Sequence, residues 1–186
     1  MELPPQIKNY NSETALVVDQ GSKQAGWVVI GKNLFKSGCI KCSGIASYDR
    51  IIMLFRELQE LIDTYEPEII VFEGSTIFTH RNAASRIILC HLHYRMQELG
   101  YFNEIPTIEI HSPTVRSVWK ALIPNRYIDK KYTKDLLRAS VESVFKIKEK
   151  LQQDEIDAIA IAYVFALRYK KLLADILLEE GPKASG

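Results

Sequence analysis

The chain has 186 residues, of which 47% are hydrophobic and 25% are charged, and its formal net charge is +1. This composition suits one globular domain with a substantial core and excludes collagen-like, disordered and broadly polycationic chains. No apolar run is long enough to predict a membrane span. Three cysteines, together with a start that lacks a basic region followed by an apolar stretch, predict a reducing, cytoplasmic location.

The elements predicted along the chain begin with strands and then alternate with helices. Residues 1–13 are polar and contain prolines, which predicts a flexible leader. Apolar runs rich in β-branched residues predict strands at 15–19, 27–30, 34–42, 69–72 and 108–110, with a hairpin turn at 31–33. Helical periodicity predicts helices at 51–65, 82–99, 133–147 and 154–175, the second of them ending at Gly100.

This order of elements favours an α/β fold with a mixed central sheet of about five strands flanked by helices. We expect a single domain over residues 14–175 and a loose tail over residues 176–186. No internal repeat or low-complexity segment divides the domain.

Four acidic residues stand at the ends of predicted buried elements. Asp19 and Glu73 each end an apolar strand directly, and if these strands are neighbours both carboxylates project from the edge where open α/β sheets place their sites. Asp154 and Asp157 are three residues apart, so they share one face at the start of a helix, whereas Glu155 points elsewhere.

A single acid in such a place is most often a turn or cap residue, but four acids together repel one another unless a cation binds between them. Carboxylate oxygens with open positions suit Mg²⁺ or Mn²⁺. Two such ions can activate water and stabilise a leaving 3′-oxygen in phosphodiester hydrolysis. The pattern therefore predicts a two-metal hydrolase.

Three sequence motifs carry a resemblance to a known family. Residues 17–27, Val-Val-Asp-Gln-Gly-Ser-Lys-Gln-Ala-Gly-Trp, resemble the opening motif of RuvC-type Holliday junction resolvases, with Gln20 in place of the family's proline. The strand that ends at Glu73 is similar to the second motif, and residues 154–162 resemble the C-terminal Asp-x-x-Asp-Ala-hydrophobic-Ala motif. Their order and separations match over about residues 14–170, and Gln20 with a longer stretch after Glu73 favours a phage-like member.

The resemblance implies an RNase H-like fold, a homodimer, and symmetric cleavage of four-way DNA junctions that leaves 5′-phosphates. Carried over residue by residue, it assigns catalysis and the binding of two Mg²⁺ or Mn²⁺ ions to Asp19, Glu73, Asp154 and Asp157. The location implied is the cytoplasm, which would be the host cytoplasm for a viral member. The helix that carries His91 and His93 is a candidate dimer interface.

Two segments supply the candidate DNA-binding residues. The loop after Glu73 contains Phe78, His80 and Arg81, and Phe78 matches the aromatic that the family inserts at the junction centre; simple packing of Phe78 is an equal alternative. Residues 112–150 hold ten basic and four acidic residues, a local balance of +6. The phosphate-binding candidates in this segment are Arg116, Lys131 and Lys134.

Other functions remain as alternatives. Relaxed cutting of forks, flaps and other branched DNA is one, and a nucleotide-binding module of the actin and sugar-kinase type is a weaker one, because 186 residues is short for its two lobes. The glycine spacing fits no phosphate-binding loop, so no nucleotide cofactor is expected. Cys39 and Cys42 form a CxxC pair, but on a strand they would face opposite ways, which disfavours zinc.

Overall fold

The computed structural model describes residues 14–21, 23–31, 34–42, 46–74, 83–122, 133–147 and 150–169. The predicted leader at 1–13, the turn residues 32–33, the loop at 75–82 and the tail from residue 170 lie outside the described residues. The elements in chain order are β1 (Thr14–Asp19), β2 (Gln24–Gly31), β3 (Leu34–Lys41), α2 (Ser47–Tyr65), β4 (Ile69–Gly74), α3 (Ala83–Phe102), β5 (Thr107–His111), α4 (Ser112–Leu122), α5 (Lys134–Phe145) and α6 (Gln153–Tyr169).

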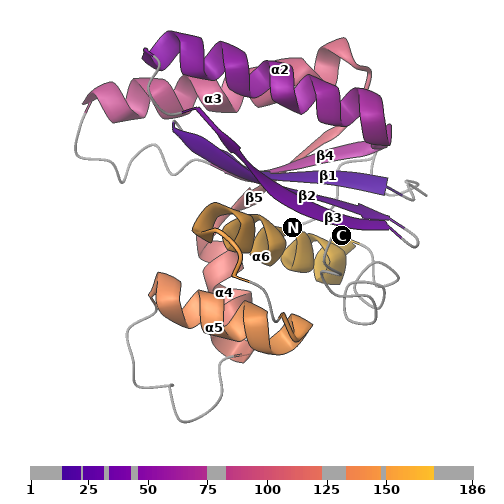
Figure 1. Cartoon of the computed structure of the whole chain (residues 1–186), viewed down its shortest axis with the longest axis vertical. Helices are drawn as coiled ribbons and strands as arrows, with labels where there is room; N and C mark the ends of the chain where they lie inside the picture. The colour runs from indigo at the N-terminus through magenta and orange to yellow at the C-terminus, as the bar shows by residue number, and fades with distance from the viewer. Residues whose placement is uncertain are drawn as a thin grey trace.

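The five strands form one mixed sheet in the order β3-β2-β1-β4-β5. The hairpin strands β1, β2 and β3 pair antiparallel, whereas β1 with β4 and β4 with β5 pair parallel. Helices α2 and α3 cover one face of the sheet, and α4, α5 and α6 lie on the other (Figure 1). This architecture confirms the predicted α/β class with a mixed sheet. No described helix is both long and apolar enough to cross a membrane.

Both faces of the central strands are buried, which explains why β1 and β4 are apolar throughout. Successive side chains of a strand point to opposite faces. In β1, Val17 belongs to the core beneath α6 and Val18 to the core beneath α2 and α3, and both are fully buried. Asp19 lies two residues after Val17, and Glu73 lies two residues after Val71, which belongs to the same core beneath α6. The side chains of Asp19 and Glu73 therefore point to the face of the sheet that α6 covers.

Helix α6 lies close against the sheet because its buried face contains many small residues. Ala160 and the alanines two residues to either side of it are fully buried. At the start of the helix the Asp154 carbonyl approaches Gly26 of β2 so closely that a Cβ at Gly26 would overlap it. From α4, the Trp119 indole Nε1 donates a hydrogen bond of 3.1 Å to the Ala160 carbonyl. These contacts fix the first turn of α6 beside the ends of β1 and β2.

The predicted end of one helix is wrong. Helix α3 does not end at Gly100 but continues to Phe102. Gly100 lies inside the helix at a point of close approach, where a Cβ would overlap the Ile105 carbonyl and the Thr107 side chain. The chain turns away later, at Glu104, which adopts a left-handed φ of 57°. The glycine is thus required for packing of the helix end on β5 rather than for a C-cap.

Candidate active site

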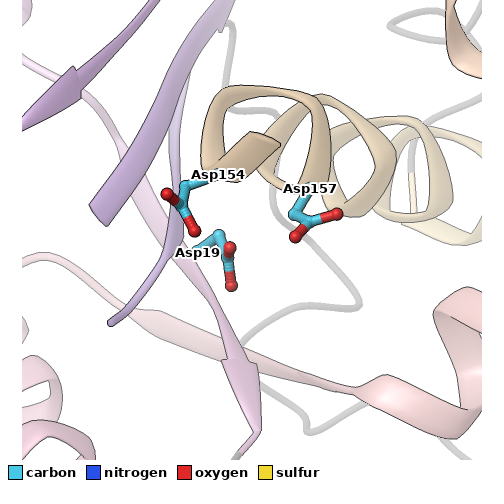
Figure 2. A group of neighbouring side chains, drawn as sticks. All are labelled: Asp19, Asp154 and Asp157. Atoms are coloured by element: carbon cyan, nitrogen blue, oxygen red, sulfur yellow. The ribbon is translucent and has the colours of Figure 1, made fainter. Parts of the chain in front are cut away.

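Three aspartates from two elements converge at the carboxyl end of β1. Asp19, Asp154 and Asp157 each offer a carboxylate oxygen, and these atoms lie within 4.8 Å of one another. Figure 2 shows Asp154 and Asp157, from the first turn of α6, beside Asp19 at the end of β1. In the part of the chain that the structure describes, no other group of three His, Cys, Asp or Glu side chains meets this spacing.

The fourth predicted acid, Glu73, stands at the end of the neighbouring strand β4. It lies outside the group of three but on the wall of the same cavity, which has a volume of about 490 Å³ and also contains Asp19 and Asp157. The residues that line this cavity are Asp19, Glu73, Ser112, Val115, Arg116, Lys134, Leu137, Asp157 and Ile161. The structure thus brings all four predicted acids to one end of the sheet.

Asp19 is the most perturbed of these acids. It is only 9% exposed, and burial raises the pKa of its carboxyl well above the usual range. The negative charges of Glu73, Asp157 and Asp154 raise this pKa further, and the nearby Lys134 ammonium lowers it only in part. In the absence of a cation the cluster therefore favours a protonated, uncharged Asp19.

Two side chains partly balance the acidic charge. The Lys134 Nζ donates a 2.7 Å hydrogen bond to Asp157 Oδ2, and the Gln24 Nε2 donates to Asp154 Oδ2. Burial lowers the pKa of Lys134, but the bond to Asp157 and the charges of Asp157, Asp19 and Asp154 outweigh it, so the pKa is raised. Burial also raises the pKa of Asp154 despite the opposing effect of Lys134. One ammonium is thus shared among several carboxylates.

The start of α6 is held by contacts on both sides. The Ser37 hydroxyl of β3 donates a 2.6 Å hydrogen bond to Glu155 Oε1, so Glu155 points away from the cluster, as the spacing predicted. From α5, Arg138 donates to the Leu151 carbonyl at 2.9 Å and to Gln153 Oε1 at 3.2 Å. These bonds position the backbone that carries Asp154 and Asp157.

The predicted DNA-binding residues fall into two groups. Arg116 and Lys134 line the cavity with the acids, as a phosphate-binding role would require. The other predicted residues, Phe78, His80, Arg81 and Lys131, lie outside the described residues.

Several site residues were not anticipated from the sequence. Ser112 and Val115 of α4, Leu137 of α5 and Ile161 of α6 complete the cavity wall. Ser112 directly follows β5 and stands one helical turn before Arg116. Its spacing from this predicted phosphate-binding residue is a sequence signal that could have identified Ser112 as part of the site. No sequence pattern points to Leu137 or to the contact of Gln24 with Asp154.

The described residues bring no third His, Cys, Asp or Glu side chain to Cys39 and Cys42 at the spacing of a metal-binding group. Cys39 lies in β3, whereas Cys42 follows that strand and is buried in the core beneath α2 and α3. Burial, with a smaller effect of Asp154, raises the pKa of the Cys39 thiol to about 11, so Cys39 stays protonated at neutral pH.

Comparison with known proteins decides the family. The family model described as crossover junction endodeoxyribonuclease RuvC matches residues 15–165, most of the chain. The chain belongs to the RuvC family. This membership confirms the resemblance of the three motifs and the predicted enzyme class.

Individual relatives support the assignment. A crossover junction endodeoxyribonuclease RuvC of Hydrogenovibrio crunogenus is 26% identical over 150 residues, which cover 78% of this chain and 82% of that protein. The RuvC of Vibrio atlanticus is 27% identical over 164 residues, covering 86% of this chain and 90% of the relative.

Among solved structures, Thermus thermophilus RuvC in complex with Holliday junction substrate has a TM-score of 0.64 at 15% identity and covers 85% of this chain and 97% of that one. A second Thermus thermophilus RuvC structure gives a TM-score of 0.60 at 17% identity, covering 86% of this chain and 97% of that one. These similarities confirm the RNase H-like fold that the resemblance implied.

The acidic cluster has a consequence for stability that depends on pH. The pKa of Asp19 is raised in the folded protein, so stability falls as pH rises from the unfolded pKa near 3.8 through the folded value, and the full penalty remains above it. In EDTA at pH 7, Asp19→Asn should therefore unfold at a higher temperature than the wild type, and this difference should vanish below pH 3.8. Thermal unfolding followed by circular dichroism measures both.

The matched control for this prediction is Glu60→Gln, which removes an exposed carboxylate from α2. It should leave the pH dependence unchanged. If Asp19→Asn is no more stable than the wild type at pH 7 in EDTA, the carboxylates do not repel one another as the geometry indicates.

Proposed function

We propose that this protein is a metal-dependent, structure-selective DNA endonuclease that resolves Holliday junctions by symmetric phosphodiester hydrolysis, leaving 5′-phosphates. The observation that carries the proposal is the convergence of Asp19, Asp154 and Asp157 beside a cavity whose wall also holds Glu73. Membership of the RuvC family over residues 15–165 supports the same activity and substrate.

The chemistry of the donor set fits divalent metal ions. The four side chains offer only hard carboxylate oxygens, which suit Mg²⁺ or Mn²⁺, and their mutual repulsion is the kind that a bound cation relieves. Asp19, Glu73, Asp154 and Asp157 would hold these ions. When bound, such ions supply water activation and stabilisation of the leaving 3′-oxygen.

The basic residues on the cavity wall would hold the DNA backbone. Arg116 from α4 and Lys134 from α5 lie on the wall that the acids share, so a phosphate in the cavity would face both signs of charge. Lys134 already contacts Asp157, and a bound phosphate would share this ammonium. Phe78, His80, Arg81 and Lys131 are the other residues that we propose to contact DNA.

Symmetric cleavage needs two active sites, and helix α3 offers a surface through which two chains could associate. Ile87, Tyr94 and Tyr101 are seven residues apart, so they lie on nearly the same side of the helix. They are 58%, 63% and 80% exposed, which is unusual for large apolar side chains in a row. We assign this stripe to the homodimer interface, on the same helix as His91 and His93.

The cleavage activity is tested with labelled four-way, forked and linear DNA in Mg²⁺ or EDTA. The wild type should cut the four-way junction symmetrically in Mg²⁺ and leave it intact in EDTA. Asp19→Asn should retain junction binding in a gel-shift assay and lose cleavage, because it keeps the shape of the side chain but removes a proposed metal ligand. Normal cutting by Asp19→Asn would contradict the site, and equal cutting of forks would favour the relaxed branched-DNA nuclease.

The dimer is tested by Tyr94→Asp, which puts a charge at the centre of the α3 stripe. We expect a dimeric wild type and a monomeric variant of the same helix content in sedimentation velocity, because burying an unpaired carboxylate at an interface is costly. The matched control is Ile52→Asp, which charges an exposed apolar position on α2 and should remain dimeric. A dimeric Tyr94→Asp would exclude the stripe from the interface.

A further inference from the structure

The two acid-bearing strands stop pairing with each other just before the acids, while β1 stays paired with β2 and β4 stays paired with β5. The parallel ladder between β1 and β4 ends with the pair Val18 and Phe72, so Asp19 and Glu73 lie one residue beyond it. Their carboxylates are on the same face and repel each other. The ladders to β2 and β5 anchor each strand end separately, so a direct bond between the two ends would set the spacing of the two carboxylates.

Gln20 provides a bond at this point. Its side-chain Nε2 donates a 3.0 Å hydrogen bond to the backbone carbonyl of Glu73, so it continues the link between β1 and β4 past the ladder. Gln20 is only 8% exposed, although glutamine is normally a surface residue. It stands directly between Asp19 and the turn that leads to β2.

The same side chain carries a cost. The Gln20 Oε1 atom is buried and has no hydrogen-bond partner among the residues that the structure describes. A buried acceptor without a partner typically destabilises a fold by at least as much as a neutral hydrogen bond stabilises it. Stability alone therefore does not explain an amide at this position, and an apolar side chain of similar length would serve the fold about as well.

We infer that Gln20 is a positioning residue for the metal site, which holds the Glu73 end of β4 at the distance from Asp19 that joint metal binding requires. This role rests on the proposed metal-dependent function. Gln20 serves this role through its Nε2 donor, because its Oε1 makes no bond to β4. Removal of the donor should then weaken metal binding without weakening the fold.

The test compares the wild type with Gln20→Met, which keeps the length of the side chain but removes the donor, and with Gln20→Asn, whose amide is one carbon too short. We expect about tenfold weaker binding of Mn²⁺ alone, measured from the electron paramagnetic resonance of the free ion without DNA. The Mg²⁺ concentration for half-maximal cleavage should rise similarly, while the KM for the junction stays constant. In EDTA, Gln20→Met should unfold within about 3 °C of the wild type.

The matched control is Gln59→Met. Gln59 links α2 to Asn103 through a 2.8 Å hydrogen bond from its Nε2, and this contact is far from the acids in the fold. Its loss should lower the unfolding temperature and leave Mn²⁺ binding unchanged, the opposite of Gln20→Met.

The outcomes separate the two claims. If the wild type binds Mn²⁺ and Gln20→Met binds it equally well, the positioning role is wrong and the proposed function stands. If Gln20→Met loses stability together with metal affinity, Gln20 is a structural residue only. If the wild type neither binds Mn²⁺ nor needs Mg²⁺ for cleavage, the proposed function itself fails.

Discussion

The repulsion among the clustered carboxylates is the constraint on which the rest of the structure depends. The Asp19 side chain is nearly inaccessible to solvent and has three acidic neighbours. Burial and each of these neighbours make the ionised form of Asp19 less favourable. A fold that minimised its own free energy would disperse these groups. Here strands, a helix and several neutral or positive side chains instead hold them at one end of the sheet, which indicates that the cluster exists for a ligand.

The architecture supplies this arrangement through close backbone contact. Parallel pairing of β1 and β4 brings two strand ends together, and the small residues of α6 let its first turn approach the hairpin. Lys134 and Gln24 then contact Asp157 and Asp154, so the cluster is partly balanced before any metal or DNA binds. The resulting cavity is lined by acids, by two basic residues and by apolar side chains from three helices. This combination suits a nucleic-acid backbone, in which charged phosphates alternate with less polar sugars.

Much of this could be predicted from the sequence because the signals are local. Apolar runs that end in Asp19 and Glu73, and an Asp-x-x-Asp at a helix start, fix which side chains share a sheet edge once the strand order is known. The near-neutral total charge hid the segregation of basic residues into the 112–150 segment. The features that were missed depend on tertiary contact. Gly100 stands in a packed helix end instead of a cap, and Gln20 and Gln24 reach partners that are distant along the chain.

The central claim is that the converging carboxylates form a divalent metal site, and anomalous diffraction from crystals grown with Mn²⁺ tests it most directly. The account predicts strong anomalous peaks among Asp19, Asp154 and Asp157, with a peak on the side of Glu73 when two ions bind. Crystals that show no anomalous density at this cluster under saturating Mn²⁺ would contradict the account.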